Sequence, residues 1–129
     1  MKVFFFVLGI LIFVSANSSF GQEDSFDCGK FLTGTFRYEE EPYTKVLIHR
    51  TETKQIESIP STGSKTTFKI VWNSACEYDL IFVKSNRPTN FKKGEIIQVK
   101  IVEVEDDSYI YEAYCRGTKS SFTIRKVSE

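Results

Sequence analysis

The chain has 129 residues, of which 41% are hydrophobic and 26% are charged, and its 17 basic residues balance its 17 acidic residues. This length allows one domain with one modest core. The charges are mixed along the chain and form no basic stripe beyond the pair Lys92 and Lys93, so the sequence argues against nucleic acid as a partner.

The first 21 residues have the pattern of a secretory signal peptide. Lys2 is followed by an uninterrupted apolar run over residues 3–14 and by a small, polar stretch over residues 15–21. The apolar run is too short for a membrane-spanning helix, which needs roughly 20 residues. Cys28 lacks the short apolar and small residues that precede a lipidated bacterial cysteine, so we expect no stable membrane anchor.

The pattern therefore predicts an exported protein, periplasmic or extracellular. We expect a signal peptide at 1–21, a short flexible lead at 22–27 and a mature β domain at 28–129; cleavage after Ala16 or Ser18 also fits the small-residue rule. Removal of Lys2 leaves 16 basic residues (17 minus one) against 17 acidic ones. The mature chain is thus nearly neutral.

In the mature domain, apolar residues recur at every second position, which is typical of half-buried β-strands. Phe68, Ile70 and Trp72 show the pattern clearly. Turn-forming residues separate these runs at short intervals, as in sheets connected by hairpins. The pattern predicts about eight strands, at residues 31–38, 44–51, 54–59, 66–73, 77–84, 95–105, 108–116 and 120–127.

One strand changes its inward face along its length. Its apolar positions switch from Ile97, Val99 and Ile101 to Val102 and Val104, which a β-bulge near Ile101 explains. Eight short antiparallel strands with local connections predict an all-β domain, either an up-and-down barrel or a strongly curved sheet that closes on itself. A two-sheet sandwich is the main alternative.

The inward positions are rich in aromatic rings, each of which buries on the order of 150 to 250 Å². We therefore expect a packed interior in place of a lipocalin-sized cavity, with an interior ligand site as the alternative. The chain resembles the lipocalin and fatty-acid-binding group in Gly34-Thr35-Phe36 on the first strand and Arg125 on the last, where that group usually has Trp in place of Phe36. The predicted core residues are Phe36, Phe68, Trp72, Tyr78, Phe82 and Phe122.

The residues form no catalytic constellation, and the sequence predicts a non-enzymatic protein without a cofactor or metal. His49 is the only histidine, so a serine or cysteine nucleophile has no other conventional base, and we expect His49 to be structural or on the surface. The acidic run at 103–107 lacks the glycine-punctuated spacing of a dedicated calcium loop. This run and the one at 39–41 are predicted to be solvated turns.

Two stretches of the chain resemble a group of short, uncharacterised exported proteins of Bacteroidetes-type bacteria. They are residues 28–36, where Cys-Gly-Lys-Phe leads into Thr-Gly-Thr-Phe, and residues 72–78, Trp-Asn-Ser-Ala-Cys-Glu-Tyr. The resemblance extends from residue 28 to about residue 127. Some members of the group carry the name DNA topoisomerase IV. That enzyme works on cytoplasmic DNA through an ATP site and a strand-cleaving tyrosine, which a short, neutral, exported chain does not fit.

Three cysteines remain after cleavage, and an oxidising compartment favours their pairing. Cys28 precedes the first strand and Cys76 lies in the turn before the fifth, where the backbone can adjust to the narrow geometry of a disulfide. Cys115 lies within a strand, where it can pass as a small buried apolar residue. The sequence therefore predicts a Cys28–Cys76 disulfide, which the resemblance also favours, with a Cys76–Cys115 linkage as the alternative.

Two functional hypotheses follow. The first is a binding or interaction module of the cell envelope that contacts an unknown envelope protein or glycan through exposed loops, such as 60–65 and 87–94, or through a sheet edge. The second is a lipocalin-like carrier of a small apolar ligand inside the barrel. An interior void of several hundred Å³ favours the carrier, and a filled core favours the interaction module.

Overall fold

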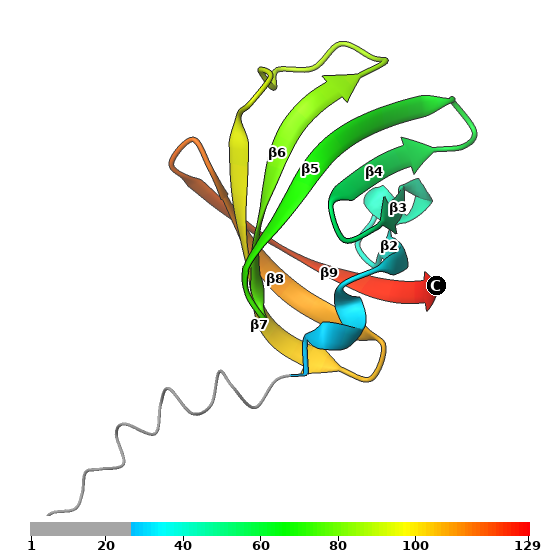
Figure 1. Ribbon diagram of the computed structural model, residues 1–129. Coiled ribbons are helices and arrows are strands. Elements are labelled where there is room, and N and C mark those ends of the chain that lie inside the picture. The colour runs from blue at the N-terminus through cyan, green and yellow to red at the C-terminus, as the bar shows by residue number, and fades with distance from the viewer. Residues whose placement is uncertain (1–26) are drawn as a thin grey trace, which may run out of the picture.

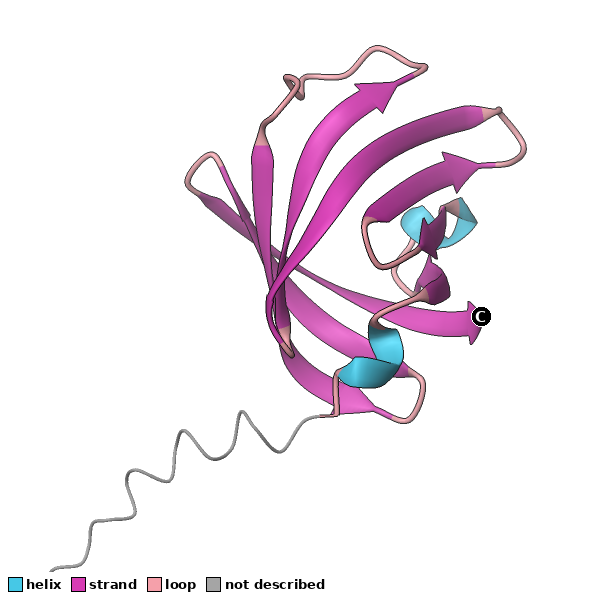
Figure 2. Cartoon of the chain, viewed as in Figure 1, coloured by secondary structure: helices cyan, strands magenta, loops and turns pink. Residues whose placement is uncertain are grey.

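The computed structural model describes residues 27–129 and shows a closed antiparallel barrel (Figures 1 and 2). Each strand pairs with the next one along the chain, and the last pairs with the first to close the barrel. The up-and-down barrel is therefore confirmed, and the two-sheet sandwich is wrong. The predicted signal peptide and the lead as far as residue 26 lie outside the described residues. The strands are β2 (Gly34–Tyr38), β3 (Leu47–Arg50), β4 (Lys54–Ile59), β5 (Ser64–Ser74), β6 (Glu77–Ser85), β7 (Ile96–Glu105), β8 (Ser108–Cys115) and β9 (Thr118–Ser128).

Within residues 27–129, two short 3₁₀ helices overlap the starts of two strands that the sequence predicts, 31–38 and 44–51. They are η2 (Gly29–Phe31) and η3 (Tyr43–Lys45). Consequently β2 begins at residue 34 instead of 31, and β3 begins at residue 47 instead of 44. A single helical turn is too short to produce a hydrophobic period, so the apolar pattern cannot distinguish it from the start of a strand.

The predicted bulge in β7 is confirmed. The register between β7 and β8 shifts between Ile101 and Glu103, so Val102 is the additional residue. Before the bulge Ile101 is buried, and after it Val104 packs against the core. The extra residue thus returns the apolar side chains to the inner face, as expected for a β-bulge.

Gly34 is required where the barrel closes. Its φ of 135° lies in a region that other residues rarely adopt. A Cβ atom at this position would lie 2.6 Å from the Cε atom of Lys126 and 3.0 Å from the carbonyl oxygen of Ser128. Both residues belong to β9, so the missing side chain allows the close approach of β2 and β9.

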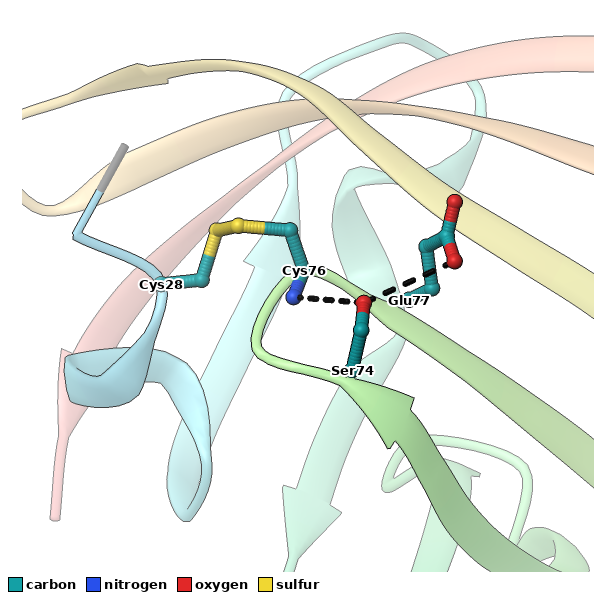
Figure 3. The surroundings of a disulfide bond; sticks show 4 residues. All are labelled: Cys28, Ser74, Cys76 and Glu77. Carbon is teal, nitrogen blue, oxygen red and sulfur yellow. Dashed lines mark hydrogen bonds between the residues drawn. A yellow bond between two sulfur atoms is a disulfide. The ribbon is translucent and has the colours of Figure 1, made fainter. Parts of the chain in front are cut away.

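The helix η2 and a disulfide close one end of the barrel, opposite the long β6–β7 loop (Figure 1). The structure contains the Cys28–Cys76 disulfide, which joins the residue before η2 to the β5–β6 turn (Figure 3). The Cα atoms of the two cysteines lie 5.4 Å apart, whereas Cys115 is a free thiol. Phe31 of η2 is 0% exposed, and its ring centroid lies 4.8 Å from that of Tyr109.

The aromatic residues predicted for the core divide into two groups. Four of the six are buried, namely Phe36, Phe68, Tyr78 and Phe82. Trp72 and Phe122 are only partly buried, although both pack against the core. The ring centroid of Trp72 lies 4.6 Å from that of Tyr78, and its Nε1 atom is buried without a hydrogen-bond partner. Because Trp72 lies near the end of β5, its ring is not covered on all sides.

Replacing Phe36 by Ala should lower the free energy of unfolding by about 3–5 kcal/mol, because the ring is fully buried. Trp72→Ala should cost less, since its ring is already partly exposed. Urea denaturation of both variants measures the difference, with Val127→Ala, at a position 48% exposed, as a surface control. Unfolding of Phe36→Ala at the parent's urea midpoint would contradict the assignment of the inner face.

Candidate functional site

A cavity of about 260 Å³ lies inside the barrel. The aromatic rings therefore leave part of the interior unfilled. The rings of Phe31, Phe36 and Tyr109 gather at the end closed by η2, with centroids 4.8 to 6.4 Å apart. Farther from η2, the small side chains of Ala113 and Cys115 take inward positions on β8 and leave the space unfilled.

The mouth of the cavity lies away from η2. Arg50, Gln55 and Tyr78 line its inner part and are buried. In contrast Cys115, in the last position of β8, is partly exposed, and Ser120 near the start of β9 is exposed, although both line the same cavity. The side chains therefore become more exposed toward the β8–β9 hairpin, where the cavity meets solvent.

Arg50 is the central polar residue at the inner end. It is the last residue of β3 and is 3% exposed. Its Nε donates a hydrogen bond to Gln55 Oε1 (2.8 Å), its Nη1 to the carbonyl oxygen of Phe31 (3.0 Å) and its Nη2 to the hydroxyl of Tyr78 (3.2 Å). The guanidinium carbon lies 4.4 Å from the ring centroid of Phe36 and 4.9 Å from that of Tyr78. Neutral groups and π faces therefore hold this buried charge.

Gln55 connects this charge to a carboxyl group on β4. An arginine side chain only donates hydrogen bonds, so Gln55 must turn its oxygen toward Arg50 and its NH₂ group away from it. The Nε2 atom then donates to Glu57 Oε2 at 3.0 Å. Gln55 is 2% exposed, and Glu57 is partly buried in the cavity wall. Arg50, Gln55 and Glu57 thus form one polar relay with fixed hydrogen-bond directions.

Burial raises the pKa of the Glu57 carboxyl above its usual value. The hydrogen bond from Gln55 and the positive charge of Arg50 act in the opposite direction but do not cancel the effect. Burial in the cavity wall therefore disfavours the charged form of Glu57.

Tyrosine hydroxyls complete the polar lining. The hydroxyl oxygens of Tyr78 and Tyr109 lie 2.7 Å apart, and Tyr111 donates to the hydroxyl oxygen of Tyr38 at 3.3 Å. Burial raises the pKa of Tyr38 and Tyr111 well above the usual value, and the negative charge of Glu57 adds to the effect. These hydroxyls therefore stay neutral and serve as hydrogen-bonding groups.

The polar relay could hardly be predicted from the sequence. Arg50 stands next to turn-forming residues, and Gln55 and Glu57 are polar at the alternate positions of a short strand. Polar residues with period two normally indicate the solvent face of a strand. One feature of the sequence does not fit that interpretation. Ile56, between Gln55 and Glu57, would then face the core, yet it is not part of a strong apolar repeat.

Other residues singled out by the sequence lie on the outside of the barrel. His49 is exposed, and its Nδ1 atom lies 3.1 Å from the hydroxyl of Thr35. Arg125 is exposed and binds Asp107 of the β7–β8 turn at 2.5 Å, with Glu39 as a second partner. The arginine that stacks on the ring of Phe36 is Arg50, on β3.

Comparison of the chain with protein-family models, curated proteins and solved structures finds no match. Among residues 27–129, no helix has the length and apolar character needed to cross a membrane. The interior cavity, with its apolar wall and the hydrogen-bonded side chains of Arg50, Gln55 and Glu57, is the candidate site.

Replacing Arg50 by Lys should destabilise the protein by about 2–4 kcal/mol. A lysine cannot reach the three separate acceptors that the guanidinium binds, and an unmet buried acceptor costs about 1–3 kcal/mol. Chemical denaturation measures the loss. Arg37→Lys, at an exposed position of β2, is the matched control and should change the stability by less than about 0.5 kcal/mol. Equal stability of the two variants would contradict the role given to Arg50.

Replacing Glu57 by Gln should raise the melting temperature at neutral pH. A carboxyl whose pKa is raised by folding contributes stability at low pH, and this contribution is lost as the pH rises through the raised pKa. The melting temperature of the variant relative to the parent should therefore increase between about pH 4, near the usual value for Glu, and pH 7.

Thermal unfolding at a series of pH values checks this prediction. Glu52→Gln removes one negative charge from the exposed turn before β4 and serves as the control. A difference between Glu57→Gln and the parent that does not grow with pH would contradict the proposed environment of Glu57.

Proposed function

We propose that the protein is a non-enzymatic carrier that binds a small, mostly apolar ligand with one polar end inside the barrel. The observation that carries this proposal is the cavity of about 260 Å³, which combines apolar walls with converging polar groups. Such a combination is the usual composition of a small-molecule site. Phe68, Leu80, Val99 and Phe122 are among the apolar side chains of the wall.

The volume limits the size of the ligand. An apolar cavity of about 150 Å³ in another protein accommodates benzene, and drug-sized ligands occupy cavities of about 300 Å³ or more. A cavity of about 260 Å³ therefore suits a single ring, or a short alkyl chain, with a small polar substituent. Long-chain lipids exceed this space.

The barrel closure supports the carrier over one form of the alternative hypothesis, contact through a sheet edge. Each strand from β2 to β9 pairs with a neighbour on either side over part of its length, so within residues 27–129 no strand is an edge strand along its whole length. Contact through the loops would not require the interior cavity or its polar relay. The carrier explains both features, and we therefore prefer it to the interaction module.

We also propose that the carrier works in the periplasm or outside the cell. The Cys28–Cys76 disulfide is consistent with an oxidising compartment. The signal-peptide pattern of residues 1–21 supports the same location.

Blocking the mouth of the cavity tests the carrier function. Ser120 lines the mouth, whereas its neighbour Ser121 is exposed and lies outside the set of cavity residues. In ligand-observed NMR with toluene and 2-phenylethanol as probes, the parent and Ser121→Trp should bind, and Ser120→Trp should lose most of its binding. Both positions are exposed, so neither tryptophan needs to enter the core. Absence of binding by the parent, or equal binding by the two variants, would refute the proposal.

A further inference from the structure

We propose that the polar end of the ligand is a hydrogen-bond donor, in its best form a primary ammonium group, that pairs with Glu57 in the cavity wall. This inference rests on the carrier function proposed above. It follows from the unequal way in which the barrel satisfies its two interior charges, those of Arg50 and Glu57.

Arg50 needs no ligand. Each of its three guanidinium nitrogens already donates to an acceptor within the protein, at distances of 2.8 to 3.2 Å. Its charge also lies over the rings of Phe36 and Tyr78. An anionic ligand would therefore have to compete for a cation that the protein has already bound.

Glu57 is in the opposite situation. Its Oε2 atom accepts the hydrogen bond from Gln55, while its Oε1 atom accepts none from the described residues. No ion pair reaches the carboxyl within residues 27–129, and the charge of Arg50 acts on it only from a distance. A carboxylate in a partly buried wall is costly unless donors surround it. The cavity thus leaves one acceptor open for a ligand.

The other groups that face Glu57 favour the same choice. They are Arg50 on β3, Tyr38 on β2 and Tyr111 on β8. The two tyrosines are neutral and joined by a hydrogen bond between their hydroxyls. They therefore offer a ligand hydroxyl oxygens as acceptors without adding charge. A primary ammonium brings three N–H donors and a charge opposite to that of the carboxylate. A ligand carboxylate would instead be repelled by Glu57.

Three matched probes test the inference: 2-phenylethylamine, 2-phenylethanol and 3-phenylpropionate share one ring and a short chain but differ in their polar end. In calorimetric titrations at neutral pH, the amine should bind most tightly, by about tenfold or more over the alcohol, which is the order that one charge-assisted hydrogen bond supplies. Glu57→Gln should remove this advantage, while the alcohol should bind the variant about as well as it binds the parent.

The variants separate the possible outcomes. Retained binding of 2-phenylethanol shows that Glu57→Gln is folded, and Glu52→Gln should keep the order of the three probes because it removes a charge outside the cavity. If the alcohol or the carboxylate binds most tightly, or if the amine binds Glu57→Gln as well as the parent, the inference about Glu57 is refuted and the carrier function stands. If no probe binds the parent, both fail.

Discussion

The closed half of the barrel depends on the hydrogen bonds of one buried group, the guanidinium of Arg50. Removing such an ion from water costs several kcal/mol, which only well-placed partners can offset. Arg50 obtains them from three elements at once: η2 through the carbonyl of Phe31, β4 through Gln55 and β6 through Tyr78. The position of η2, the direction of the Gln55 amide and the packing of the closed end are therefore consequences of one desolvated charge.

The disulfide supports this arrangement from outside the cavity. A helix of three residues has little stability of its own, yet η2 must hold Phe31 against the core and its carbonyl against Arg50. The bond from Cys28 to Cys76 fixes η2 to the β5–β6 turn across a sequence separation of 48 residues. In the chain-entropy model a loop of this size contributes roughly 4 kcal/mol. The closed end can thus be rigid while small side chains keep the other end open.

Much of the fold was predictable from the sequence because strand periodicity is a local property. The alternation around Phe68 indicated β5, and the change of face after Ile101 indicated the bulge. The cavity was not predictable, since its size depends on which side chains meet across the barrel. Aromatic residues on separate strands cluster beside η2, and Ala113 and Cys115 face the remaining space. Strand periodicity indicates which rings face inward but not how they are distributed along the barrel axis, so the number of rings alone predicted a filled interior.

The polar relay explains why a barrel of this size keeps a carboxyl group inside. The Gln55 amide oxygen accepts a hydrogen bond from Arg50, and its NH₂ group donates one to Glu57. The position of Arg50 therefore sets the direction of the amide, and the amide in turn holds the Glu57 carboxyl in the cavity wall. Burial raises the pKa of Glu57, and the hydrogen bond from Gln55 and the charge of Arg50 only partly offset this effect. Natural proteins retain such costs mainly where function needs them. A ligand that donates to Glu57 would both fill the cavity and remove the cost, so that binding and folding stability increase together.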